Sequence, residues 1–141
     1  MTLYAESSAV LTWLFGEPGG EAVRESLAAA ELVLASDLTL IECDRALFRA
    51  EATGRITEEA AADSRAYLAT AAVHWNLLRL DSEVVERARR PFPAEPIRTL
   101  DALHLASALV ASAAIPGLAL LSLDDRVRAA GQRLGFTLLP A

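Results

Sequence analysis

The chain has 141 residues, of which 53% are apolar, and a formal net charge of −6. Its length suits one domain, residues 1–141, and its apolar share is far above that of a disordered chain. The negative charge argues against a broadly basic nucleic-acid-binding surface, although a local arginine patch can still bind phosphate.

Short apolar segments alternate with longer helical segments along the chain. In order, we predict strand 3–5, helix 9–15, helix 21–30, strand 32–35, helix 37–51, helix 57–73, strand 75–80, helix 82–90, helix 100–112, strand 118–122, helix 124–135 and strand 136–139. This alternation predicts an α/β domain around a mostly parallel sheet of about five short strands. Ser7 and Ser8 are predicted to cap the first helix, and Thr99 the helix that starts at residue 100.

No segment has the length and apolar character of a membrane span or a secretory signal. The single cysteine, Cys43, excludes an internal disulfide. These features predict a cytoplasmic protein that does not insert into a membrane.

Four acids lie at predicted element ends. Glu6 directly follows the first strand, Glu42 lies in the helix after the second, Asp101 opens a helix, and Asp124 directly follows the fourth strand. Ligands of open parallel sheets bind at the carboxyl ends of the strands, where these acids are expected to meet. Crowded carboxylates repel unless a cation neutralises them, and an all-oxygen donor set favours Mg²⁺ or Mn²⁺ over zinc.

Each acid also has an ordinary structural interpretation. Asp101 and Asp124 sit where a helix N-terminus favours a carboxylate. Glu42 could pair with Arg45 or Arg49 on the same helical face. The prediction of a metal site therefore depends on all four acids coinciding.

Four stretches resemble motifs of the PIN-domain family and, within it, the VapC toxins. They are residues 3–10, 36–42, 100–109 and 121–126, and Leu100-Asp101-Ala102-Leu103-His104-Leu105-Ala106 carries the greatest similarity. Together they span nearly the whole chain in the family's order.

The resemblance implies a three-layer α/β/α sandwich and a Mg²⁺- or Mn²⁺-dependent endoribonuclease toxin that cleaves structured RNA, such as tRNA or rRNA. It implies a homodimer and a VapB-like antitoxin whose C-terminal segment covers the site. Its catalytic and metal-binding acids would be Glu6, Glu42, Asp101 and Asp124. Ser8 and Ser122 match hydroxyl positions that organise the site.

One residue departs from the family pattern. The first acid is normally Asp, whereas this chain has Glu6. The extra methylene moves the carboxylate by about a bond length, and catalysis is sensitive to displacements of about 1 Å. The alternative function is therefore a catalytically weakened PIN-like module that acts through protein or RNA contacts. A generic anion-binding α/β domain fits poorly, because the chain has neither a P-loop nor a Gly-rich dinucleotide turn.

Several other residues have two interpretations. Asp125 is either a helix cap or a second-metal ligand. His104 is expected to be a packed, hydrogen-bonded residue rather than a general base. Cys43 is expected in the core, and His74 is expected either to cap a helix end or to lie at the surface.

The remaining candidates are aromatic or cationic. Trp13 and Trp75 are expected as core or interface anchors. Arg45, Arg49 and Arg126 are candidates for RNA phosphate contacts or for ion pairs that offset the acidic site, and a dimer could bring two such sets to one groove.

Overall fold

The computed structural model describes residues 1–141 and has a five-stranded, fully parallel sheet in the order β3-β2-β1-β4-β5. The strands are β1 (Thr2–Ala5), β2 (Leu32–Ser36), β3 (Asn76–Leu78), β4 (Ala119–Leu121) and β5 (Thr137–Leu139). The helices are α1 (Ser7–Leu14), α2 (Gly20–Ala29), α3 (Asp37–Ala52), α4 (Glu58–Ala72), α5 (Ser82–Ala88), α6 (Thr99–Ala114) and α7 (Asp125–Arg133). The predicted α/β class and parallel sheet are confirmed.

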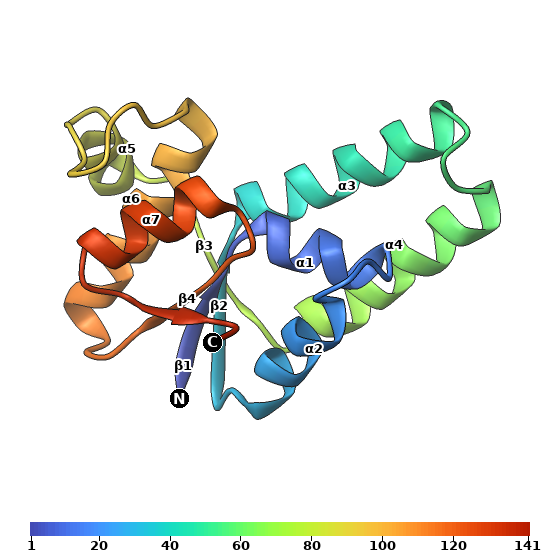
Figure 1. Cartoon of the computed structure of the whole chain (residues 1–141), viewed down its shortest axis with the longest axis horizontal. Coiled ribbons are helices and arrows are strands. Elements are labelled where there is room, and N and C mark those ends of the chain that lie inside the picture. The colour runs from blue at the N-terminus through green and yellow to red at the C-terminus, as the bar shows by residue number, and fades with distance from the viewer.

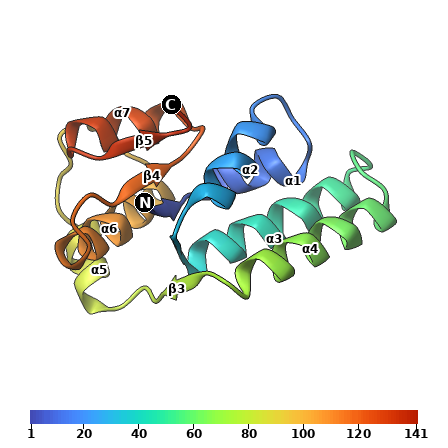
Figure 2. The ribbon, with the colours of Figure 1, turned by 90° about the horizontal axis from the view of Figure 1, so that it is seen from below.

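Helices cover both faces of the sheet, which gives the predicted three layers. Figures 1 and 2 show α1 to α4 on one side of the strands and α5 to α7 on the other. Side chains alternate between the faces along each strand. Leu3 and Ala5 therefore join a core cluster with α1 to α4, whereas Tyr4 joins the cluster formed with α5 to α7.

The strand order places a topological switch beside β1. The chain moves from β1 to β2 and β3 on one side, and β4 pairs with the other edge of β1 before leading to β5. Connections therefore diverge at the carboxyl ends of β1 and β4, which leaves a crevice there. The residues that follow these strands, Glu6 and Ser122–Asp124, border that crevice.

Helices α3 and α4 form a hairpin that projects beyond the sheet (Figures 1 and 2). The two helices pack along each other, so the projecting arm is a continuous unit. Its N-terminal end starts at the carboxyl end of β2 and lies beside the crevice. None of the helices combines the length and the apolar composition that a membrane-spanning helix requires.

The structure corrects two predicted helix caps. The first helix starts at Ser7, and its N-cap is Glu6, whose carboxylate accepts a hydrogen bond from the Ser8 backbone N–H. Helix α6 starts at Thr99 itself, after Arg98, and has no side-chain cap. The predictions that Ser7 and Ser8 cap the first helix and that Thr99 caps α6 are therefore wrong, because residue type alone does not place the helix start.

The predicted strand 75–80 is shorter than expected. Only Asn76–Leu78 pairs with β2, at the edge of the sheet. The available partner residues of β2 end at Ser36, so Arg79 and Leu80 have no strand to pair with.

Candidate active site

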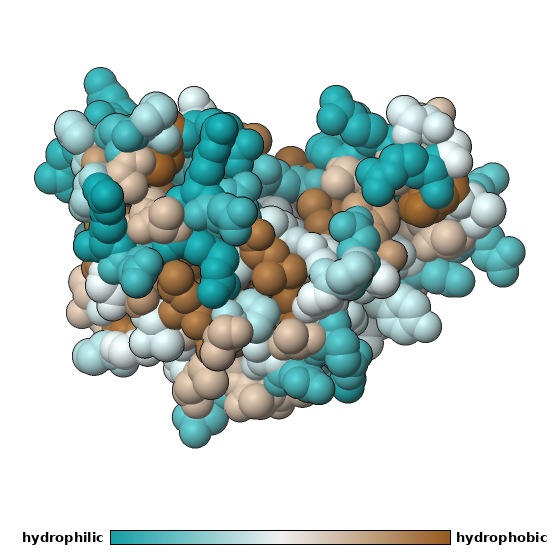
Figure 3. Space-filling model, in the orientation of Figure 1, coloured by the Kyte–Doolittle hydropathy of each residue, from teal (hydrophilic) through white to brown (hydrophobic).

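The four predicted acids line one pocket of about 370 Å³ at the carboxyl edge of the sheet. Glu6 follows β1, Glu42 lies in α3, Asp101 is in the first turn of α6, and Asp124 caps α7. Figure 3 shows the surface hollowed between the α5–α7 side and the projecting α3–α4 hairpin. Residues up to 118 positions apart in sequence are thus brought together, as the strand-end argument predicts.

Glu6 is held by hydroxyl groups at the base of this pocket. Only 4% of the residue is exposed. Its carboxylate accepts hydrogen bonds from the Ser8 backbone N–H at 3.1 Å, from the Ser8 hydroxyl and from the Ser122 hydroxyl at 2.7 Å. The contacts join the ends of β1 and β4, so Glu6 organises the crevice as well as contributing charge to it.

Ser8 also fixes the segment that carries the fourth acid. Its hydroxyl oxygen accepts hydrogen bonds from the backbone N–H groups of Leu123 and Asp124 at 3.0 and 3.1 Å. Ser122 Oγ accepts a further bond from the Asp124 N–H at 3.1 Å. Both serines therefore link Glu6 to the segment that carries Asp124.

Arg98 bridges the other two acids of this edge. Its Nε lies 2.7 Å from Asp101, and its Nη2 lies 2.9 Å from Asp124. These carboxylates, Asp101 first, raise the pKa of Arg98. Sequence reasoning missed Arg98, although its position three residues before Asp101, at the N-cap of α6, was an available signal.

Asp124 is stabilised as a carboxylate by its position at a helix start. Burial disfavours its charge, but backbone hydrogen bonds from Val127 and Arg126 and the Arg98 guanidinium outweigh this and lower its pKa. Its Oδ1 accepts the N–H groups of Arg126 and Val127 at 2.9 and 3.0 Å. The cap of α7 is thus Asp124, and the interpretation of Asp125 as a helix cap is wrong.

Glu42 is tied to a buried histidine rather than to an arginine. His104 Nε2 lies 2.5 Å from Glu42 Oε1, and the Ser7 hydroxyl donates to the same oxygen at 2.7 Å. Burial raises the pKa of Glu42, but the hydrogen bonds from His104 and Ser7 outweigh burial, and its pKa is lowered. The possible pairing of Glu42 with Arg45 or Arg49 does not form.

His104 is a buried, hydrogen-bonded residue, as predicted. It is 1% exposed, and its Nδ1 lies 2.8 Å from the Tyr4 hydroxyl. Cys43 is buried in the core, and burial followed by nearby carboxylates raises the pKa of its thiol. His74 is at the surface, and Trp13 and Trp75 pack against the core cluster on the α1–α4 side.

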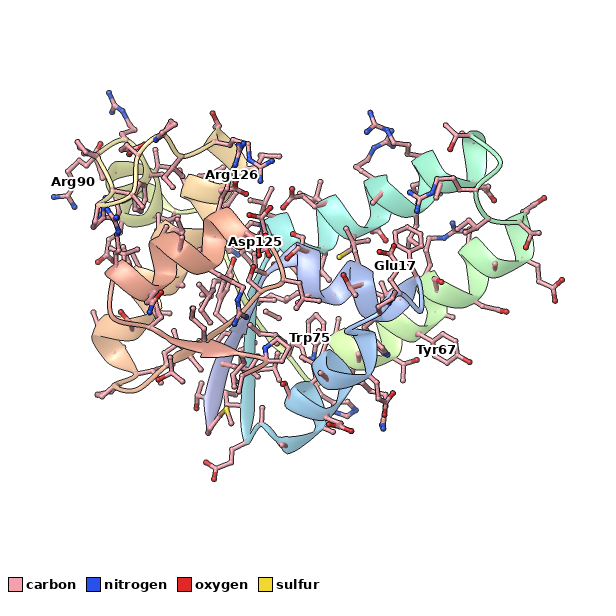
Figure 4. All side chains as sticks on the ribbon, in the orientation of Figure 1. Glu17, Tyr67, Trp75, Arg90, Asp125 and Arg126 are labelled. Atoms are coloured by element: carbon pink, nitrogen blue, oxygen red, sulfur yellow. The ribbon has the colours of Figure 1, made fainter.

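The cationic candidates and Asp125 lie outside the acidic pocket. Arg45 and Arg49 line a second, larger groove beside it, of about 780 Å³. Figure 4 shows Asp125 and Arg126 at the start of α7, where both are exposed. Arg126 does not form an ion pair with the four acids, and Asp125 does not line their pocket.

The donor atoms of the pocket fit a hard divalent cation. All four acids offer carboxylate oxygens, and no thiolate competes. As they stand, however, no three of the acidic or histidine side chains are close enough to form a ligand shell. Arg98 already bridges Asp101 and Asp124, so a metal ion would have to displace its guanidinium from that position.

Comparison with known proteins identifies similar chains. Residues 3–132 match the family model described as PIN domain. Ribonuclease VapC46 of Mycobacterium tuberculosis is 32% identical over 138 residues, which cover 97% of this chain and 95% of that protein.

Solved structures that share the fold include the following two. VapC20 of M. tuberculosis, described as a Sarcin-Ricin loop cleaving toxin, has a TM-score of 0.63 and 18% identity, with 92% of this chain and 95% of that chain covered. VapBC2 from Rickettsia felis, bound to a DNA fragment from its promoter, has a TM-score of 0.66 and 8% identity, with 98% and 97% covered. At these identities, the structural likeness concerns the fold alone.

Proposed function

The chain belongs to the PIN domain family, and we propose that it is a Mg²⁺- or Mn²⁺-dependent endoribonuclease toxin of the VapC type. The observation that carries this proposal is the convergence of Glu6, Glu42, Asp101 and Asp124, from four separate elements, on one pocket at the topological switch. The names of the similar proteins support ribonuclease activity as the chemistry of that pocket.

The four acids differ in how many carboxylate oxygens remain available to bind a metal ion. Asp101 and Glu42 each keep one carboxylate oxygen that accepts no hydrogen bond from the chain. Asp124 uses both oxygens, but its bond to Arg98 is exposed and replaceable. When bound, the ion supplies activation of a water molecule and charge neutralisation at the scissile phosphate. Ser8 and Ser122 would hold the Glu6 carboxylate in place while a metal ion replaces Arg98.

A groove beside the pocket offers a path for an RNA strand. One face of α3 lines this groove from Leu38 to Arg49, which spans about 16 Å along the helix. Arg45, Arg49 and Arg55 lie along the same groove, and Arg45 and Arg49 are exposed and free of ion pairs. Their local positive charge complements phosphate despite the net charge of −6. We propose tRNA or rRNA as the substrate class.

A VapB-like antitoxin is the proposed partner. Ile41 and Leu100 are large apolar residues with 54% and 46% exposure, and both line the groove next to the acids. A C-terminal antitoxin segment that covered them would bury apolar surface and close the pocket. A homodimer is also proposed, because it could place two arginine sets beside one RNA. Light scattering of the antitoxin-free chain measures this assembly directly.

The second candidate function is a binding module with weakened catalysis. The observation that favours it is the hydrogen bonding of both Glu6 oxygens to serine groups, with no three-ligand shell formed. A Glu6→Asp variant distinguishes the two functions. If the wild-type chain is inert and this variant cleaves RNA, Glu6 is the cause of the lost activity.

Cleavage of a total tRNA and rRNA pool tests the main proposal. The purified, antitoxin-free chain is expected to cut RNA with Mg²⁺ or Mn²⁺ and to stop in EDTA. Asp101→Asn removes one charge from the pocket at nearly constant volume and is expected to abolish cutting. Asp125→Asn makes the same chemical change outside the pocket and should retain activity. Cutting that persists in EDTA or in Asp101→Asn would contradict the proposal.

A further inference from the structure

A continuous chain of buried side chains leads from the sheet to Glu42. The Tyr4 hydroxyl of β1 lies 3.1 Å from Ser36 Oγ and 2.8 Å from His104 Nδ1. On the other side of the ring, His104 Nε2 contacts Glu42 Oε1 at 2.5 Å and Ser7 Oγ at 2.9 Å. The ring is thus fixed at both nitrogens by side chains from different elements.

The chemistry of these groups fixes the direction of the bonds near Glu42. A carboxylate accepts hydrogen bonds only, so the proton between the two groups resides on His104 Nε2. The Ser7 hydroxyl donates a hydrogen bond to the same Oε1 at 2.7 Å. Oε1 therefore receives two donors, whereas Oε2 of Glu42 receives none.

His104 is too deeply buried to take part in catalysis directly. His104 is 1% exposed, whereas the Glu42 side chain is 26% exposed and lines the pocket. The imidazole cannot touch a substrate, so it acts only through the carboxylate that it holds. A histidine with a merely space-filling role would not need a pocket acid as its partner.

We propose that His104 is a positioning residue that, with Ser7 and Tyr4, holds Glu42 Oε1 inside the protein and leaves Oε2 for a divalent cation. This inference rests on the proposed metal-dependent function. Groups that orient metal ligands typically change metal affinity about 10- to 100-fold when removed. Metal affinity is expected to fall because, without His104, the Glu42 side chain would rotate freely and the metal would have to order it on binding.

Two amide variants of His104 provide a matched test. In His104→Gln the amide N–H falls near the position of Nε2 and can still donate to Glu42. In His104→Asn the shorter amide falls near Nδ1 and cannot reach Glu42. Mn²⁺ affinity of the folded, RNA-free chain, measured by isothermal titration, is expected to fall about 10-fold in His104→Asn and to stay within about 3-fold in His104→Gln.

A double-mutant cycle shows whether the effect passes through Glu42. In a Glu42→Gln background, His104→Asn should cause no further loss of Mn²⁺ affinity. Tyr4→Phe removes one oxygen and is a milder variant, expected to lower Mn²⁺ affinity by a smaller factor and only when Glu42 is present. It serves as the test if His104→Asn does not fold.

Nuclear magnetic resonance of the metal-free chain gives a readout independent of Mn²⁺. A protected His104 Nε2–H signal is expected in the wild type and should move on Glu42→Gln substitution. Equal Mn²⁺ affinity in folded His104→Asn and wild type would overturn the positioning role alone. A wild-type chain that binds no Mn²⁺ would overturn this inference and the proposed metal dependence together.

Discussion

Replacing Glu6 by Ala should destabilise the metal-free chain substantially. The change removes the N-cap of α1, worth about 1 kcal/mol. It also takes the acceptor from the Ser8 and Ser122 hydroxyls, which can bond to each other only at 3.3 Å. A buried donor left without a good partner costs about 1–3 kcal/mol. The expected loss in the free energy of unfolding is therefore about 2–4 kcal/mol.

Glu6→Gln is the matched control, because it keeps the volume and one acceptor oxygen. It should lose only about 1 kcal/mol, the difference between a charged and a neutral acceptor. Urea unfolding in EDTA measures both variants, and thermal unfolding should show shifts of about 3 °C per kcal/mol for a chain of this size. Removing a carboxylate also relieves repulsion in the pocket. An Ala variant as stable as wild type would refute the net stabilisation of the metal-free chain by Glu6.

Three further predictions concern other parts of the molecule. The pKa values of Glu42 and Asp124 are lowered in the folded chain, so the unfolded chain binds protons first as pH falls. The urea concentration at the unfolding midpoint should therefore decrease below about pH 4.5. This decrease should be smaller in Glu42→Gln. Gly20→Ala should lower the free energy of unfolding by about 1–3 kcal/mol, although alanine has the better helix propensity. The added Cβ would lie 2.8 Å from the Thr12 carbonyl oxygen. Urea unfolding of the variant and the wild type measures this loss. Arg49→Glu, in the groove, should weaken RNA binding and reduce the dependence of binding on salt concentration. Arg90→Glu, on the α5 side (Figure 4), should change neither. If filter binding shows an equal loss of RNA affinity in both variants, the groove is not the RNA path.

Local patterns predicted most of the fold because each strand is a short apolar segment with its own flanking signals. The strand from residue 75 was predicted too long, since its length depends on where β2 ends and not on its own composition. The caps at Ser7, Ser8 and Thr99 were wrong for a related reason. Serine and threonine suit an N-cap by type, but the exit direction of the preceding segment decides which residue occupies it.

The acids of the site and two of their partners, Ser8 and Ser122, could be predicted from the sequence, whereas the contacts of His104 could not. Residue type and position after a strand identify Glu6 and Asp124, whatever the rest of the chain does. By contrast, His104 meets Glu42 across 62 residues and Tyr4 across 100. Such contacts depend on how α3 and α6 approach each other over the end of the sheet. Arg98 lay within reach of local reasoning, because its spacing to Asp101 is a helical one.

Each acid of the pocket has a partner supplied by the chain itself. The pairs are Glu6 with Ser8 and Ser122, Glu42 with His104 and Ser7, Asp101 with Arg98, and Asp124 with Arg98 and the start of α7. These contacts offset the mutual repulsion of four carboxylates. The fold therefore already contains what it needs to keep the pocket open without an added cation.

This internal neutralisation predicts that folding does not require metal. Treatment with EDTA should leave the unfolding temperature of the purified chain unchanged, in contrast to a structural metal site, whose removal unfolds the protein. Added Mn²⁺ should raise that temperature only as its concentration passes the dissociation constant, as ligand binding to the native state requires. Arg98→Gln removes the cation that competes for Asp101 and Asp124, so this variant should be stabilised at lower Mn²⁺ concentrations than wild type. If EDTA alone unfolds the wild-type chain, the carboxylates are not balanced by their protein partners, and the metal is a structural component of the fold.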